Sequence, residues 1–218
     1  MNLQATPQTA TRASIKRGRK YEQVIAGARE VCLAEGYEGA SVDGIARAAG
    51  VSKATLYSYF PDKRLLFMEV ATLECRRQTD TALEAIDTTR PPREVLRFAA
   101  HRMMDFVLSP FGIGVFRVVV AETARFPEIG REFWLCGPER GKQILVDYFG
   151  EACARGELEI DDRRLAADQF AELCKADLFP RLIFGLAREF SKQERARVAE
   201  GAVETFLARY GVQGPQST

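Results

Sequence analysis

The sequence predicts an all-α protein, with a small N-terminal head of three helices and a larger helical body. Apolar residues recur at spacings of three and four along most of the chain, as one face of a helix requires. No segment shows the apolar and polar alternation of a strand bounded by turn residues. Glycines, prolines and N-cap residues divide the chain into about nine helical segments.

The head is predicted over residues 16–64, after a polar tail at 1–15 that is expected to be disordered. Its first helix has an apolar face and ends near Gly36. Ser41 caps a second helix, which Gly50 ends. Ser52 caps a third helix that runs to about Tyr59, and a fourth helix begins at Lys63. The apolar face of the first helix consists of Tyr21, Ile25, Ala28 and Cys32.

The body is predicted over residues 65–211 as five further helical segments, with a flexible tail at 212–218. A kink or break is expected at Gly137-Pro138, and a kink at Pro180. Ser191 and Glu194 form a capping box at the start of the last helix. The five segments are 93–108, 110–124, 127–156, 162–186 and 191–210.

Composition excludes several classes of protein. The chain has 46% hydrophobic residues, but no uncharged apolar run reaches the roughly 20 residues of a membrane span, and no secretory signal is visible. We therefore expect a cytoplasmic protein. Five cysteines without a CxxC pair argue against disulfides and zinc, although a redox-sensing thiol is an alternative to a buried one. The single histidine, His101, lacks companion ligands, so neither metal nor cofactor is expected.

Charge is unevenly distributed along the chain. Residues 1–64 hold ten Lys or Arg against six Asp or Glu, whereas the whole chain has a net charge of only +1. A basic run without acids precedes Glu22, as expected of an arm that lies near phosphates. A merely solvated tail is the alternative. This run consists of Arg12, Lys16, Arg17, Arg19 and Lys20.

Residues 42–60 have the spacing of a helix-turn-helix. Ala46 is small where two short helices must cross, and Gly50 allows the turn between them. If Leu56 points inward, Ala54 and Ser58 lie nearly opposite, with Thr55 and Tyr57 on the flanks. Such a small, polar outward face suits a helix that reads the major groove of DNA. The alternative is a short helix pair inside a larger core.

The stretch ASVDGIARAAGVSKATLYSYFPDKRLLF resembles the DNA-binding motif of TetR-family regulators. The resemblance implies base contacts from Lys53, Ala54 and Ser58. It also implies phosphate contacts from the residues matching Ser41, Thr55, Tyr57, Tyr59 and Lys63; Ser52 and Arg17 complete the predicted DNA-binding set. The chain departs from the family at Ala54, where glycine is frequent, and at Arg64, where an acid is common.

The stretch RFPEIGREFWLCGPERGKQILVDYF resembles the body of AcrR-like, multidrug-responsive members. The resemblance implies a small-molecule pocket in the middle helices and a dimer formed by the last two helices. For each aromatic or Met side chain, plain core packing is the alternative. The expected pocket residues are His101, Met104, Phe116, Trp134, Phe170 and Cys174. The expected dimer residues are Phe170, Ala199, Val203, Phe206 and Tyr210.

Together these features predict a one-component repressor that binds palindromic double-stranded DNA as a homodimer and is released by a small hydrophobic effector. Catalytic motifs such as GxSxG, the P-loop and HExxH are absent from the sequence, so we expect no enzyme. A ligand-blind or architectural DNA-binding protein, or an activator of the same family, is the alternative. The sequence indicates neither the operator nor the effector.

Overall fold

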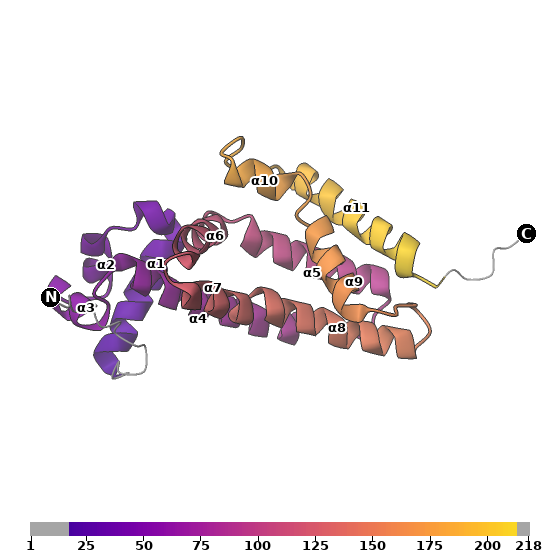
Figure 1. Cartoon of the computed structure of the whole chain (residues 1–218), viewed down its shortest axis with the longest axis horizontal. Coiled ribbons are helices and arrows are strands. Elements are labelled where there is room, and N and C mark those ends of the chain that lie inside the picture. The colour runs from indigo at the N-terminus through magenta and orange to yellow at the C-terminus, as the bar shows by residue number, and fades with distance from the viewer. Residues whose placement is uncertain (1–17, 213–218) are drawn as a thin grey trace, which may run out of the picture.

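The computed structural model describes residues 18–212, and most of these residues lie in helices (Figure 1). The all-α prediction is confirmed. The expected tail at 1–15, all of the expected tail at 212–218 except Val212, and the basic residues Arg12, Lys16 and Arg17 lie outside the described residues. The helices are α1 (Arg19–Gly39), α2 (Val42–Ala48), α3 (Lys53–Tyr59), α4 (Lys63–Ala85), α5 (Pro92–Val107), α6 (Pro110–Thr123), α7 (Pro127–Cys136), α8 (Pro138–Ala154), α9 (Arg163–Leu173), α10 (Leu178–Ile183) and α11 (Lys192–Tyr210).

The head and the body lie at opposite ends of the molecule (Figure 1). Helices α1 to α3 form the head, and the long helix α4 runs from it into the body beside α7 and α8. One hydrophobic cluster joins the head to the first half of α4, to α6 and to Ile129 of α7. A second cluster joins α5, α8, α9 and α11. Because α6 and α4 belong to the head's own cluster, a movement of either helix would be transmitted to the head.

Two predicted long segments are each divided, which raises the expected nine helices to eleven in the described part of the chain. The break at Gly137-Pro138 was expected and separates α7 from α8. The break in the segment 162–186 occurs at residues 174–177, so the prediction of a kink at Pro180 was wrong. Asp177 adopts φ 65°, which ends the helical path. Pro180 lies in the first turn of α10, where its missing N–H costs nothing.

No single helix of residues 18–212 is both long and apolar enough to cross a membrane. The α5 and α6 pair reaches that threshold together, but the two helices meet at a bend of 67°.

Candidate DNA-binding surface and effector pocket

Helices α2 and α3 form the helix-turn-helix, and side-chain caps define the beginning of each. The hydroxyl of Ser41 accepts the Gly44 N–H at 2.9 Å, and the hydroxyl of Ser52 accepts the Thr55 N–H at 3.1 Å. Gly50 adopts φ 61° in the turn, a left-handed conformation that favours glycine. The expected boundaries of the motif are thus confirmed.

Helix α1 supports this pair from behind through a very close contact. A Cβ atom at Gly27 would lie only 2.4 Å from the backbone nitrogen of Ala49, at the end of α2. On α3, the side chain of Leu56 is completely buried. The ring of Tyr21 packs against that of Tyr59 at a centroid distance of 6.1 Å. These contacts leave α3 little freedom to rotate about its axis.

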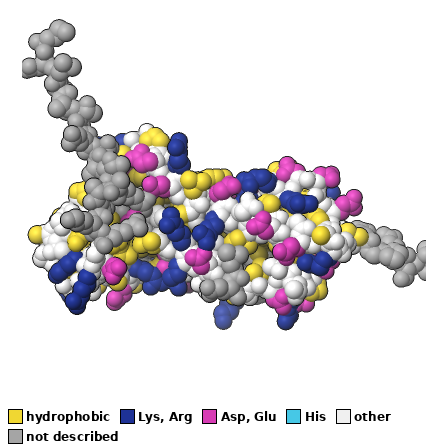
Figure 2. Space-filling view, turned by 90° about the horizontal axis from the view of Figure 1, so that it is seen from below, with side chains coloured by type: hydrophobic (Ala, Val, Ile, Leu, Met, Phe, Trp, Pro, Cys, Tyr) yellow, Lys and Arg dark blue, Asp and Glu magenta, His cyan; other side chains and the backbone are white. Residues whose placement is uncertain are grey.

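The outward face of α3 matches the face predicted from Leu56. Lys53, Ala54, Tyr57 and Ser58 are exposed, whereas Thr55 is half-buried. The ammonium of Lys53 forms an ion pair with Asp43 of α2. Figure 2 shows Lys and Arg side chains, with Asp or Glu among them, over the end of the molecule that the head forms. A convex, partly basic face of this kind can enter the major groove of DNA.

The beginning of α4 provides a second group that could contact DNA. Lys63 is the first residue of α4, and its ammonium lies 4.5 Å from the centre of the Tyr37 ring. The ring supports the cation at a helix N-terminus, where free N–H groups also attract anions. Of the other residues predicted to bind DNA, Ser41 and Ser52 are exposed at the N-caps and Tyr59 is half-buried. Arg17 lies outside the described residues.

Arg64 is a structural link that sequence reasoning did not assign. Its guanidinium donates to Glu122 of α6 at 2.5 Å and to Asp62 at 2.7 Å, and it lies 4.7 Å from the ring of Phe126. It therefore joins the start of α4 to the body. The only signal in the sequence was that a basic residue stands where the family commonly has an acid.

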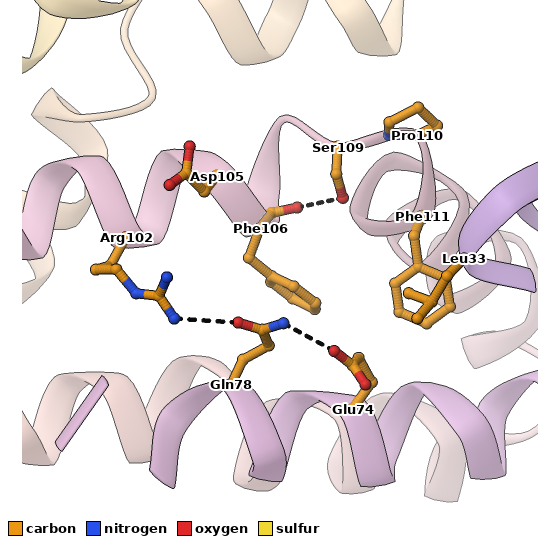
Figure 3. A pocket seen from close by; sticks show the side chains of 9 residues that line it. All are labelled: Leu33, Glu74, Gln78, Arg102, Asp105, Phe106, Ser109, Pro110 and Phe111. Carbon is orange, nitrogen blue, oxygen red and sulfur yellow. Dashed lines mark hydrogen bonds between the residues drawn. The ribbon is translucent and has the colours of Figure 1, made fainter. Parts of the chain in front are cut away.

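A pocket of about 280 Å³ opens between α1, α4, α5 and the start of α6 (Figure 3). Arg102 of α5 donates to the amide oxygen of Gln78 at 3.3 Å, and Gln78 donates to Glu74 of α4 at 2.8 Å. The pocket is lined by Leu33, Glu74, Gln78, Arg102, Asp105, Phe106, Ser109, Pro110 and Phe111. It thus combines an apolar end with a polar chain that connects two helices.

The carboxylates of this pocket are already paired. Burial by itself would raise the pKa of Glu74, but hydrogen bonds from Arg77, Arg29 and Gln78 outweigh it and lower the pKa to about 2. Asp105 forms an ion pair with Arg195 of α11. The Arg102 Nε is buried and has no hydrogen-bond partner among the described residues. Arg102 thus lines the pocket and keeps one unused donor within its wall.

The six residues expected to form an effector pocket do not line this pocket. Met104, Phe170 and Cys174 are buried in the core of the body. Phe116 packs against Phe179 at a centroid distance of 5.0 Å, and Trp134 is 49% exposed beside Lys142. His101 is half-buried on α5. A second, more open pocket of about 550 Å³ between α1, α6 and the end of α10 is not lined by any of the six either.

The apolar stripe of α11 faces into the protomer. Ala199, Val203 and Phe206 are almost completely buried, and the ring of Phe206 lies 5.4 Å from that of Phe170. The Tyr210 hydroxyl donates to Gln169 of α9 at 2.6 Å. These side chains hold one protomer together, so they are not free to contact a partner. The sequence prediction did not distinguish the inner from the outer face of the helix.

No group of three or more His, Cys, Asp or Glu side chains suited to a metal ion occurs within residues 18–212.

Family models match both parts of the chain. Residues 24–70 match bacterial regulatory proteins of the tetR family, and residues 94–212 match the C-terminal domain of AefR-like transcriptional repressors. The activator FasR of Mycolicibacterium smegmatis is 33% identical over 93 residues, which are 43% of this chain and 42% of FasR. The repressor AcnR of Corynebacterium efficiens is 33% identical over 63 residues, which are 29% of this chain and 34% of AcnR. These matches span less than half of either relative.

Solved structures match over nearly the whole chain. A TetR-family regulator from Mesorhizobium loti has a TM-score of 0.76 and 29% identity, covering 93% of this chain and 100% of the other. The flavonoid-responsive regulator FrrA has a TM-score of 0.64 and 31% identity, and the match covers 91% of this chain and 100% of FrrA. The likeness therefore extends from the DNA-binding head through the body, and the chain belongs to the TetR family of transcriptional regulators.

Proposed function

We propose that this chain is a dimeric repressor whose two α3 helices read a palindromic operator, and that a small effector bound in the body releases the DNA. The observation that carries the DNA-binding part is the outward face of α3, which is exposed and polar and bears Lys53, Ala54 and Ser58. In a two-fold dimer, two such faces would enter half-sites about 34–36 Å apart.

We place the effector in the pocket of Figure 3. Leu33, which lines it, belongs to α1 of the head, while Arg102 belongs to α5 of the body. A ligand between them would contact both parts of the molecule, so its binding can favour one head orientation over another. Phe106 and Phe111 offer apolar contacts, and Arg102 offers a donor.

These groups suit a small aromatic molecule that carries an acidic or carbonyl oxygen. FrrA, with 31% identity, is described as flavonoid-responsive, which supports an effector of this class. The multidrug-type body and its six pocket residues stay a prediction. Three of the six, Met104, Phe170 and Cys174, are buried in the core, and none of the six lines the Arg102 pocket.

For the dimer we propose the outer faces of α9 and α11. On α11, Gly201, Thr205 and Ala208 are exposed at a spacing that places them on one face. A Cβ atom at Gly201 would meet nothing within 4 Å. Small side chains allow two helices to approach closely, and Leu165 of α9, which is 51% exposed, would add apolar area.

The experiment has two stages. DNA selected from a random pool by the purified protein should contain an inverted repeat, and its affinity should then be measured with flavonoids and aromatic carboxylates. A ligand that favours the DNA-free form should weaken DNA binding about 5- to 150-fold. Failure to enrich any sequence would contradict the proposed function.

A matched pair of variants tests the effector site. Arg102→Ala should abolish the response to the ligand, whereas Arg188→Ala should leave it intact, because Arg188 lines only the second pocket. The reverse result would move the effector to that pocket. A ligand bound equally well with and without DNA would exclude release by that ligand.

The second candidate function is that of an activator. FasR, one of the matched relatives, is described as an activator. Transcription from a promoter containing the selected operator, measured in vitro with and without the protein, distinguishes the two.

A further inference from the structure

Two cysteines that are far apart in the sequence lie side by side in the fold. Cys75 belongs to α4, and Cys136 is the last residue of α7. Each thiol is the largest influence on the pKa of the other, and the Cys136 thiol also donates to the Phe133 carbonyl oxygen at 3.5 Å. The backbone agrees with this contact, since a Cβ atom at the neighbouring Gly137 would lie 3.8 Å from the Cys75 sulfur. Both side chains are more than nine-tenths buried.

The surroundings of the two sulfurs differ. The neighbouring Cys75 thiol lowers the pKa of Cys136, and Thr72 and the positive charge of Arg76 act in the same direction against burial. The same contact, together with burial, raises the pKa of Cys75. Cys136 is therefore the group that becomes a thiolate, while Cys75 stays protonated beside it.

The other buried cysteines lack this arrangement. Burial raises the pKa of Cys32 to about 11 and that of Cys174 to about 12, and the groups that act on them do not include a second thiol. The thiol pair between α4 and α7 is thus a local feature of this contact and not a general property of the core.

We propose that Cys136 and Cys75 form an oxidisable dithiol, in which Cys136 reacts with a small hydroperoxide and Cys75 then closes a disulfide. In the first step, the Cys136 thiolate attacks the terminal peroxide oxygen, the O–O bond breaks, and the released alkoxide or hydroxide takes up a proton. Cys136 is now a sulfenic acid. In the second step, the Cys75 sulfur attacks the Cys136 sulfur, the S–O bond breaks, and water leaves with the Cys75 proton. Two thiols are oxidised, and one peroxide is reduced to an alcohol or water.

The cross-link would lie on the helix that joins the head to the body. Leu66 and Phe67, earlier on α4, belong to the head's cluster, whereas α7 continues into α8 of the body immediately after Cys136. A disulfide would tie α4 to this junction. The inference does not rest on the proposed repressor function, because the bond itself is measured.

The test uses the full chain, first reduced and then treated with hydrogen peroxide while folded. The wild type should lose the mass of two hydrogens, and digestion should yield a peptide that joins Cys75 to Cys136. Reduction with dithiothreitol should restore both thiols. Absence of this linked peptide from a protein that keeps its native circular dichroism would overturn the proposal.

Single variants test the two roles. With Cys75→Ser, which keeps an O–H donor beside Cys136 but cannot form a disulfide, Cys136 should stop at the sulfenic acid, which dimedone traps. With Cys136→Ala, Cys75 should stay unmodified. The matched control Cys174→Ala should form the cross-link as the wild type does. If an alanine variant unfolds, the corresponding serine variant replaces it. Dimedone on Cys75 in place of Cys136 would overturn the assignment of the nucleophile.

Discussion

Replacing Gly27 by alanine should disable the head although it adds only one methyl group. The new carbon would lie 2.4, 2.6 and 2.7 Å from the backbone nitrogen, Cα and Cβ of Ala49. Carbon atoms normally approach to about 3.5–4.0 Å, so α1 and α2 would have to separate by roughly 1 Å. Backbone atoms cannot rotate away as the end of a long side chain can.

Two opposing contributions determine the size of the effect. Alanine in a helix is more stable than glycine by about 0.5–1 kcal/mol. Overpacking of a close contact costs typically ~1–3 kcal/mol, and a clash with backbone belongs at the upper end. We therefore expect a net loss of about 2–2.5 kcal/mol in the free energy of unfolding. Because α2 carries α3 through the Gly50 turn, the displacement should also reduce operator affinity.

The assay combines urea unfolding with fluorescence anisotropy on the selected operator. Gly141→Ala is the matched control, because a Cβ atom at this position of α8 meets nothing within 4 Å. The control should be as stable as the wild type or gain up to ~1 kcal/mol, with unchanged DNA binding. Wild-type stability and affinity in Gly27→Ala would refute the argument that this contact positions α3.

Three further predictions follow from charge and burial. Lys63→Ala should reduce the slope of log DNA affinity against log salt concentration by about 0.9 for each head, whereas the control Lys192→Ala, at the start of α11, should leave the slope unchanged. An unchanged slope in Lys63→Ala would show that Lys63 does not contact DNA. Phe206→Glu should destabilise the fold by at least about 3 kcal/mol, because the side chain is buried, whereas Ala208→Arg should separate dimers without unfolding. Thermal melting and sedimentation distinguish the two effects, and a folded, stable monomer of Phe206→Glu would contradict the buried position of Phe206. Because the pKa of Glu74 is lower in the folded protein, ionised Glu74 should add on the order of 2–3 kcal/mol to the free energy of unfolding, discounted for its exposed arginine partners. This contribution should be complete above the unfolded pKa of about 4.5 and should disappear as the pH falls through about 2, and Glu74→Gln should flatten that part of the pH–stability curve.

The sequence alone determined the features that depend on neighbouring residues. The caps at Ser41, Ser52 and Ser191 and the turn at Gly50 are visible in it because each involves a contact within three or four residues. The outward face of α3 followed from helical geometry once Leu56 was taken as buried. The family resemblance of the head rests on this same short segment, which the family model also matches.

Contacts between residues that are far apart in the sequence are visible only in the tertiary structure. Helical periodicity shows that α11 has an apolar face, but not whether Phe206 contacts its own protomer or a partner. The break at Asp177 has no strong local signal, because residues 174–177 contain neither glycine nor proline, and Asp177 itself adopts the positive φ of 65°. The Arg102 pocket and the thiol pair of Cys75 and Cys136 depend on how α4 lies against α5 and α7. Such contacts arise from the packing of whole helices, which one sequence does not specify residue by residue.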